Sequence, residues 1–350
     1  MDQKHRLSPK LKVFSIPDQK PDTRFVLFDE TEIHLHSTVL KLHSAFFRKF
    51  LDSPDKKPAE PTAEFRYEWV SEIEEDGEWH MVEKSHAKAN NNVLSENTFW
   101  DMEVLVFIEM LNSLYRIPYA IWVTRLFIVT KMADYYCCLP AVSHNLFACF
   151  DQSNNEYVAE HAVKLLDIAY KLRQPLLFKD CLVHVAGYMP PNSGNYHHVC
   201  NRVIYDVMMK ARNEVNRRVV EAQKRLMLCT PSEERSKFLG HCWEIGSEET
   251  EGQLSLPRYF RLLAEHDSEF ASALFDVLQC ELRLPSESNH EAGARGISDQ
   301  DNFYCARLLD RDLPTSRLQM FNLQRSIYLL YYPAMILYPL NVLSLIEIMT

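Results

Sequence analysis

The chain has 350 residues, of which 47% are hydrophobic, and it carries a formal net charge of −10. This length exceeds what one hydrophobic core usually serves, so we expect two or three compact units. The negative charge disfavours nucleic acid as the main partner, because phosphate binding depends on a surplus of lysine and arginine.

The sequence lacks the common signatures of catalysis. Only 8 glycines occur, fewer than the roughly 7% that is usual, so loops that cradle phosphate are hard to build. The nucleotide-binding, serine-hydrolase and zinc-protease motifs are missing, and the 9 cysteines form no C-x-x-C pair. We therefore expect no enzyme and no cofactor. The opening "MDQKHRLSPKLKVF" has no apolar signal-peptide core, which predicts a cytoplasmic or nuclear protein with reduced thiols.

The first residues are polar and rich in proline. Residues 1–24 contain Pro9, Pro17 and Pro21, which predicts a disordered tail. From Phe25 onward, "FVLF", the polar "DETE" and "IHLH" predict two short strands joined by a tight turn.

A helical pattern follows these strands in "STVLKLHSAFFRKF". Ser37 lies where an N-cap is expected, since its hydroxyl can accept a hydrogen bond from a free backbone N–H. Phe46, Phe47 and Phe50 fall at i, i+1 and i+4 on this helix. We expect at least two of these rings to be buried.

Residues 64–84 predict a hairpin, because an Asp-Gly pair separates two alternating segments. Trp69, Ser71 and Ile73 are expected on one side of the first segment. The turn of this hairpin is acidic and is the predicted partner surface. Charge changes there are expected to preserve folding but to weaken a partner with a basic surface. The surface consists of Glu74, Glu75, Asp76 and Glu78.

From Thr98 to about residue 150 the pattern predicts successive apolar helices, separated near Pro118 and Pro140. Residues 158–172 predict another helix with one buried stripe. The stripe comprises Val158, Ala162, Leu165, Leu166, Ala169 and Leu172.

A long amphipathic helix is predicted next, with a basic outer face that we interpret as solvated, because acidic residues interrupt it. Its apolar positions are Val199, Val203, Val207, Ala211, Val215, Val219, Ala222 and Leu226; its basic ones are Arg202, Lys210, Arg217, Lys224 and Arg225. Beyond Thr230, polar loops surround a helix expected from about Pro257 to Leu282.

Several of these features combine into one longer pattern. A strand pair ending in histidine precedes a helix with a Val-Leu step and a Ser-x-x-Phe motif, and an Ala-Asp-x-Tyr helix pair comes later. The residues concerned are His36, Val39, Leu40, Ser44, Phe47, Ala133, Asp134 and Tyr136. Over residues 25–150 this pattern resembles a BTB/POZ domain. The 64–84 hairpin looks like an insertion seen in a large group of fungal BTB proteins, as do "LLDIAYKLRQPLLFKDCLVHVAGYM" and "YCARLLDRDLPTSRL" downstream.

The resemblance implies an α+β, mainly helical protein, in which a BTB/POZ-like α/β domain is followed by a helical region at 155–230 and a carboxyl-terminal helical region at 231–350 with polar loops. The resemblance also implies that the protein functions through protein–protein contacts, as an adaptor or scaffold. Such proteins associate with themselves, dock transcriptional co-regulators, or bridge a substrate to a cullin-type ubiquitin ligase. Family dimers commonly use a helix and a strand ahead of the first core strand, and the proline-bearing leader departs from that pattern.

Three histidines leave two interpretations open. His34 and His36 are two apart on a strand, and His43 could fold back from the helix to complete a zinc site. Alternatively, the resemblance implies that His36 is a structural residue at a strand-to-helix corner, hydrogen-bonded to backbone. A zinc site also needs acceptors behind its ligands, which the sequence does not identify. We predict that no metal binds here.

Three further clusters contain residues of metal or acid–base chemistry without the spacing that such sites need. We interpret them as ordinary loop or helix residues. They are His197, His198 and Cys200; His241 and Cys242; and Asp310 and Asp312.

The last apolar stretch, residues 327–348, is long enough for about 20 residues of membrane span. Pro333 and Pro339 interrupt helical hydrogen bonding, and no Lys/Arg cluster follows. We expect short helices docked on the helical region, or an appended tail, rather than insertion. The alternatives to a soluble adaptor are a membrane-tethered scaffold and an enzyme of unrecognised type.

Overall fold

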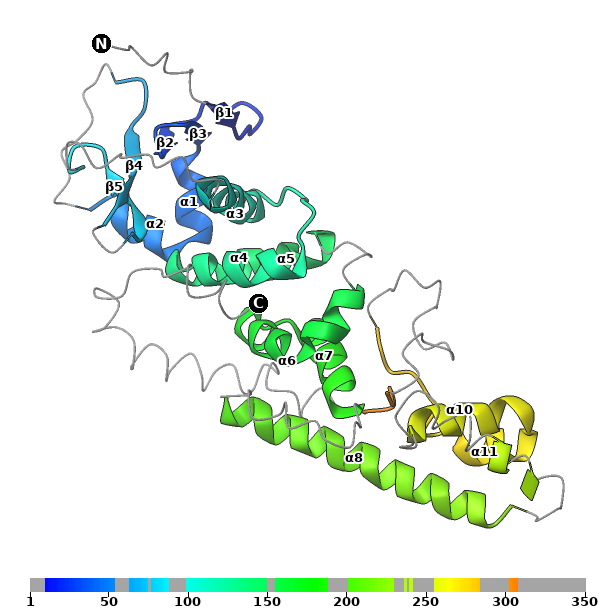
Figure 1. The fold of residues 1–350 in the computed structure, drawn as a ribbon. Helices are drawn as coiled ribbons and strands as arrows, with labels where there is room; N and C mark the ends of the chain where they lie inside the picture. Colours follow the sequence, from blue (N-terminus) through cyan, green and yellow to red (C-terminus); the bar gives the residue numbers. More distant parts are fainter. Residues whose placement is uncertain are drawn as a thin grey trace, which may run out of the picture. The chain divides into compact units, whose positions relative to one another are not determined.

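We describe the fold from a computed structural model (Figure 1). Backbone contacts divide the chain into unit 1 (residues 1–150 and 330–350) and unit 2 (residues 151–329). The protein is α+β and mainly helical, and its described strands all lie in unit 1. The structure describes residues 10–53, 63–74, 77–87, 99–149, 155–187, 201–229, 236–237, 239–241, 255–283 and 302–307.

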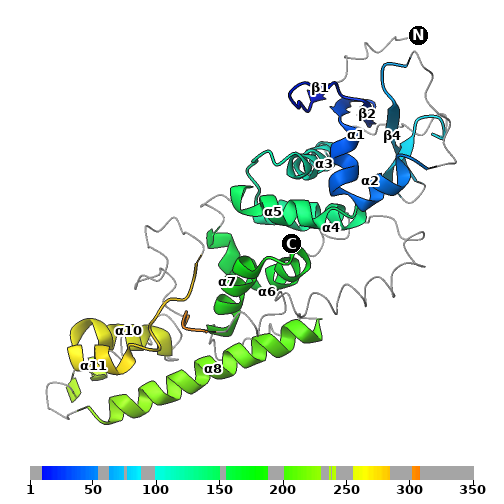
Figure 2. The ribbon, with the colours of Figure 1, turned by 180° about the vertical axis from the view of Figure 1, so that it is seen from behind.

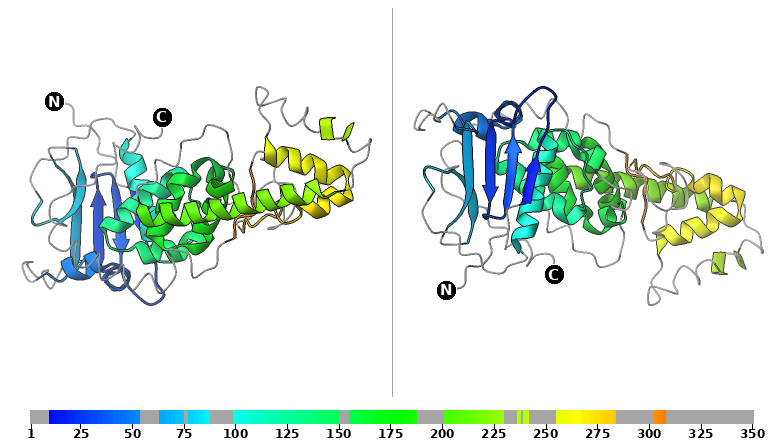
Figure 3. Two further views of the ribbon diagram at one scale, coloured as in Figure 1. Left: turned by 90° about the horizontal axis from the view of Figure 1, so that it is seen from below. Right: turned by 90° about the horizontal axis from the view of Figure 1, so that it is seen from above.

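Unit 1 contains a five-stranded mixed sheet with the order β1-β3-β2-β4-β5 (Figure 3). β2 and β3 form one antiparallel hairpin and β4 and β5 form another, as the sequence predicts. The hairpins join through parallel pairing of β2 with β4, so the second hairpin is an integral part of the sheet. The strands are β1 (Lys10–Val13), β2 (Thr23–Leu27), β3 (Thr31–Leu35), β4 (Tyr67–Ile73) and β5 (Trp79–Glu83).

The leader is ordered from Lys10, contrary to the prediction of a disordered tail to residue 24. β1 pairs in parallel with β3, and Phe14, which directly follows it, is buried against the ring of Tyr115 with centroids 4.5 Å apart. Pro17 and Pro21 follow this strand rather than interrupt it, so neither removes a hydrogen bond from its pairing with β3. A four-residue strand is too short to show its period in the sequence.

The helices of unit 1 lie against one face of the sheet (Figures 2 and 3). Pro118 lies in the loop between α3 and α4, and Pro140 lies in the first turn of α5, where proline is tolerated. The helices are α1 (Ser37–His43), α2 (Ala45–Phe50), α3 (Phe99–Leu114), α4 (Val123–Tyr135) and α5 (Leu139–Cys149).

The helix expected after β3 is divided at Ser44. This residue is extended (φ −130°, ψ 120°), and its Oγ accepts a hydrogen bond from the backbone N–H of Phe47. Ser37 is not an N-cap, because the cap position is His36 and Ser37 is already helical. The N–H and the hydroxyl of Ser37 both donate to the carboxylate of Asp22, at 2.7 and 2.6 Å. Asp22, fifteen positions upstream, thus accepts the hydrogen bonds that the first residue of α1 donates.

Aromatic rings fill the space between the sheet and the helices. Phe47 is completely buried, and its ring lies 5.6 Å from that of Phe25 on β2 and is stacked on that of Tyr136 at 5.4 Å. The prediction that two of three phenylalanines are buried is wrong. Phe46 is half-buried and Phe50 is 38% exposed. These two residues are four apart and share one face of α2, with ring centroids 4.6 Å from each other, whereas Phe47 is on the face that packs on Phe25 and Tyr136.

Unit 2 is helical in its described residues. All six residues of the stripe predicted at 158–172 are buried, which confirms that prediction. The helices are α6 (Asn155–Leu172), α7 (Pro175–Gly187), α8 (Arg202–Met227), α10 (Leu256–His266) and α11 (Ser268–Leu274).

The long helix α8 is confirmed, but its buried stripe differs at the amino-terminal end. Ile204 and Met208 are buried there, whereas Val203 is 43% exposed. Steps of four residues overshoot the 3.6-residue turn, so a stripe extended backwards in fours from Val219 rotates out of the core. The predicted basic positions on α8 are exposed.

The single helix expected from Pro257 to Leu282 is two helices, α10 and α11. Asp267 between them is extended (φ −138°, ψ 122°), and its Oδ1 accepts hydrogen bonds from the N–H groups of Glu269 and Phe270. Aspartate favours such a cap over a helix interior. Both breaks, at Ser44 and at Asp267, therefore have a local chemical cause.

Candidate interaction surface

The residues that carry the BTB resemblance meet at two corners of unit 1. His36 is buried where β3 passes into α1; its Nε2 lies 3.2 Å from the carbonyl oxygen of Gln19 and its Nδ1 3.1 Å from the hydroxyl of Tyr115. That hydroxyl also accepts a hydrogen bond from the backbone N–H of His36, at 2.7 Å. The histidine thus holds a strand-to-helix corner.

At the second corner, Ser44 and Phe47 contact the end of α4. The hydroxyl of Ser44 donates to the carbonyl oxygen of Tyr136 at 2.6 Å, and the N–H of Ala45 donates to that of Cys137. Further residues of the pattern lie in or beside the core: Leu40 and Ala133 are fully buried, and Val39 and Asp134 are half-buried. The hydrogen bonds of Ser44 and the burial of Leu40, Phe47 and Ala133 give these residues a role in holding the helices of unit 1 together.

The three histidines do not share a site. The Nε2 of His34 lies 2.6 Å from Oε1 of Glu32, and its ring packs on Phe65. His36 lies beyond the end of β3 and has the partners given above. His43 lies near Arg116, and burial, followed by the positive charge of Arg116, lowers the pKa of His43. Within the described ranges, no group of three His, Cys, Asp or Glu side chains is arranged to hold a metal.

The sheet has two chemically different faces. Residues pointing toward the helices are buried in β2 and β3, whereas the alternate residues are half-buried. We call the face away from the helices the outer face. Its residues are Leu11, Val13, Arg24, Val26, Glu32, His34, Glu68, Val70, Val82 and Lys84, placed by the strand registers and the alternation of burial.

A continuous chain of charged groups crosses the outer face. Arg24 on β2 donates to Glu32 on β3 at 2.7 Å and to Glu68 on β4 at 3.4 Å. Lys84, just beyond β5, donates to Glu68 at 2.6 Å, and His34 extends the chain from Glu32. The hydrogen bond from Arg24 lowers the pKa of Glu32, and the same bond raises the pKa of Arg24. Both groups therefore stay charged near neutral pH.

Apolar side chains on β1 border this charged chain. Leu11 is 60% exposed and Val13 is 46% exposed, and their registers place them beside Glu32 and His34. A row of fixed charges next to exposed aliphatic side chains offers both specificity and apolar area to a binding protein.

The structure describes two residues of the acidic turn predicted as a partner surface, and neither is fully exposed. Glu74 is half-buried and lies 3.7 Å from His80, whereas Glu78 is 7% exposed and hence buried. Glu78 directly precedes β5, and its backbone carbonyl accepts a hydrogen bond from the N–H of Glu74 that closes the hairpin. Glu75 and Asp76 lie outside the described residues. Glu78 therefore no longer belongs to the candidate surface.

One buried carboxyl group in unit 1 has a pKa suited to acid–base chemistry. Burial raises the pKa of Glu109 to about 7, against the opposing effect of Arg125, with which it forms an ion pair between α3 and α4. A near-neutral pKa is a mark of catalytic groups. The side chain is only 3% exposed, and the pair joins two helices, so its geometry serves packing.

In unit 2, burial lowers the pKa of His184 on α7 to about 4. An unfolded histidine has a pKa near 6.5, so only the unfolded chain gains a proton as the pH falls from about 6.5 to 4. The unfolding free energy of unit 2 is therefore highest above this window and is expected to fall by about 3 kcal/mol through it. Thermal unfolding of the natural chain and of His184→Gln between pH 8 and pH 4 measures this; identical pH slopes would contradict it.

The remaining candidates of the sequence lie mostly outside the described residues: residues 197–200, Cys242, Asp310, Asp312 and the apolar stretch 327–348. His241 is described and is exposed. Among the helices that the structure describes, none is both long and apolar enough to cross a membrane.

Sequence reasoning missed the outer face. Its polar residues alternate with buried ones in "TRFVL" and "TEIHL", and this alternation alone would have placed Arg24, Glu32 and His34 on one side. No protein-family model, no curated protein and no solved structure matches this chain.

Proposed function

We propose that the protein is a protein–protein interaction module, an adaptor or scaffold of the BTB type, and that the outer face of unit 1 is its contact surface. The observation that carries this proposal is the outer face, where a chain of paired, partly buried charges lies beside exposed Leu11 and Val13. The meeting of the signature residues at two corners supports the BTB resemblance.

The chemistry of this face favours a folded protein or extended segment as the partner. Charged groups already paired with each other add specificity more than affinity, because a partner must match their order. The exposed aliphatic side chains of β1 add the apolar area that binding requires. β1 is also an edge strand, which can accept another strand by backbone pairing. Docking on a cullin-type scaffold, co-regulator binding and self-association are all uses of such a surface.

Affinity purification with the full chain tests the proposal. The bait variant Leu11→Arg/Val13→Arg places charge on the outer face at exposed positions, where substitutions cost little stability. Leu42→Arg is the matched control, since Leu42 is 69% exposed on α1 rather than on the sheet. We expect the natural chain and the control to capture the same proteins, and the double variant to lose at least one of them. Equal capture by all three baits would refute the proposed surface.

A further inference from the structure

The strand β1 lies at one end of the sheet of unit 1, and the direction of its backbone groups is fixed by its pairing. It pairs in parallel with β3 (Figure 1), and the N–H groups of Lys10 and Phe14 donate to carbonyl oxygens on that side, at 2.7 and 3.0 Å. In a parallel pair, alternate residues direct both their N–H and their C=O to the same neighbour. Leu11 and Val13 therefore direct theirs to the opposite side, which is the open edge of the sheet.

This edge is accessible. The side chain of Leu11 is 60% exposed and that of Val13 is 46% exposed. In the part of the chain that the structure describes, the backbone of neither residue is hydrogen-bonded on the side away from β3. A row of unpaired N–H and C=O groups at the edge of a sheet is a template for a further strand. The backbone of β1 can therefore pair with an extended segment.

The side chains of β1 give the two sides of this edge different chemistry. Leu11 and Val13 lie on the outer face, so Lys10 and Lys12, which alternate with them, lie on the other side. Lys10 is exposed, and Lys12 is half-buried with its Nζ 5.4 Å from the centre of the ring of Phe14. Among the described residues, neither lysine forms an ion pair. Both positive charges are thus available to a partner.

The two lysines restrict which strand can pair with β1. Lysine in an edge strand commonly prevents the association of identical edges. A second copy of β1 placed on this edge would bring lysine beside lysine, and like charges on neighbouring strands are destabilising. Acidic side chains at the same positions would instead form ion pairs with Lys10 and Lys12. The edge therefore rejects its own copy and favours an acidic strand.

We propose that the open edge of β1 binds an extended segment of a partner protein in which acidic and aliphatic residues alternate. The aliphatic side chains of the segment contact Leu11 and Val13 on the outer face, its acidic side chains pair with Lys10 and Lys12, and its backbone adds a strand to the sheet. This inference rests on the proposed function, because it names the chemistry of the partner that meets the outer face at β1.

The first test measures the binding of a fluorescent peptide, Glu-Val-Glu-Val-Glu-Val, to the full chain by anisotropy. Leu11→Pro removes the N–H that points to the open edge and leaves the bonds to β3, whereas Leu11→Ala shortens the same side chain and keeps this N–H. We expect Leu11→Pro to bind the peptide at least about ten times more weakly than Leu11→Ala. Equal affinities of two folded variants, or equal binding of the peptide Glu-Glu-Glu-Val-Val-Val to the natural chain, would overturn the proposal.

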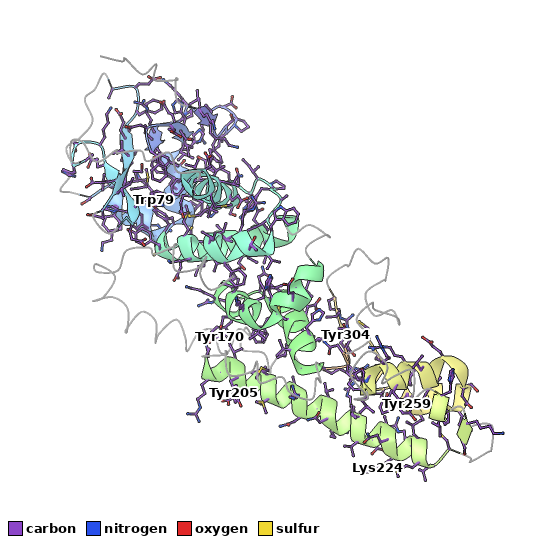
Figure 4. All side chains as sticks on the ribbon, viewed as in Figure 1. Trp79, Tyr170, Tyr205, Lys224, Tyr259 and Tyr304 are labelled. Carbon is purple, nitrogen blue, oxygen red and sulfur yellow. The ribbon has the colours of Figure 1, made fainter. Side chains whose placement is uncertain are left out.

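A charge exchange tests the lysines and also serves if Leu11→Pro does not fold. Lys10→Glu/Lys12→Glu should bind the acidic peptide about ten times more weakly than the natural chain, and it should gain binding to Lys-Val-Lys-Val-Lys-Val. Lys49→Glu/Lys224→Glu changes the net charge equally at exposed positions on α2 and on α8 (Figure 4), and it should bind the acidic peptide as the natural chain does. Equal weakening by the two double variants, or no exchange of preference, would contradict the proposal.

The affinity purification described above separates this inference from the proposed function when Leu11→Pro and Lys10→Glu/Lys12→Glu are added as baits. We expect both to lose a protein that Leu11→Arg/Val13→Arg also loses. Loss with Leu11→Arg/Val13→Arg alone would leave the outer face as the contact surface and overturn the strand pairing. Self-association of the natural chain that Leu11→Pro abolishes would make a second copy the occupant and overturn the acidic partner.

Discussion

Replacing Phe47 by alanine is expected to lower the unfolding free energy of unit 1 by about 3 to 5 kcal/mol, the usual cost of removing a buried phenylalanine ring. Phe47 is completely buried and contacts the rings of Phe25 and Tyr136, so the truncation leaves a cavity between sheet and helices. Many domains have only 5 to 15 kcal/mol in total. Folding of unit 1, and with it the outer face, should fail or become marginal.

Phe50→Ala is the matched control, because Phe50 lies on the same helix and is 38% exposed. It should cost about 1 kcal/mol or less. Denaturant unfolding followed by tryptophan fluorescence reports mainly on unit 1, since four of the five tryptophans (Trp69, Trp79, Trp100 and Trp122) lie there. Equal losses for the two variants would show that the core does not depend on Phe47.

Gly187→Ala is expected to disrupt unit 2 by a comparable amount. The added Cβ would overlap the backbone of Phe303, and the obstacle is a carbonyl rather than the end of a flexible side chain. Either α7 moves or residues 302–306 leave their place and expose Phe303. Losing the packing of that ring costs about 3 to 5 kcal/mol.

Gly240→Ala is the control that separates the loss of a glycine as such from the crowding around Gly187. Nothing lies within 4 Å of a Cβ added at Gly240, which is helical, and alanine favours a helix over glycine by about 1 kcal/mol. This control should therefore unfold at the natural temperature or slightly above it. Circular dichroism during heating distinguishes the two variants. An unchanged midpoint for Gly187→Ala would mean that the contact between Gly187 and residues 302–306 does not hold unit 2 together.

Local chemistry made much of the fold predictable. The two hairpins and the buried stripe of α6 follow directly from the periods of their apolar residues. The helix breaks at Ser44 and Asp267 did not, because a serine or aspartate within a helical pattern is compatible with both a cap and an exposed position. The capping of α1 by Asp22 depends on a contact between residues fifteen apart, which no local pattern encodes.

The candidate surface was predictable only in part. The acidic turn stood out in the sequence by composition, yet Glu78 is buried, because a single residue beside a strand can point either way. The charge chain of the outer face needs three strands in register, and the parallel pairing of β2 with β4 that brings Glu68 to Arg24 joins residues 44 apart. The burial of residues 302–306 likewise depends on contacts with distant parts of unit 2, such as Gly187 and Arg218.

Photo-crosslinking from the outer face tests the central claim most directly. A benzoylphenylalanine is placed at Lys84, which is 57% exposed on the outer face, or at Leu42, which is 69% exposed on α1. Each full chain is irradiated in extract containing the captured partners. We expect partner adducts from position 84 and none from position 42. Adducts from position 42 alone would place the contact on the helices and contradict the assignment to the outer face.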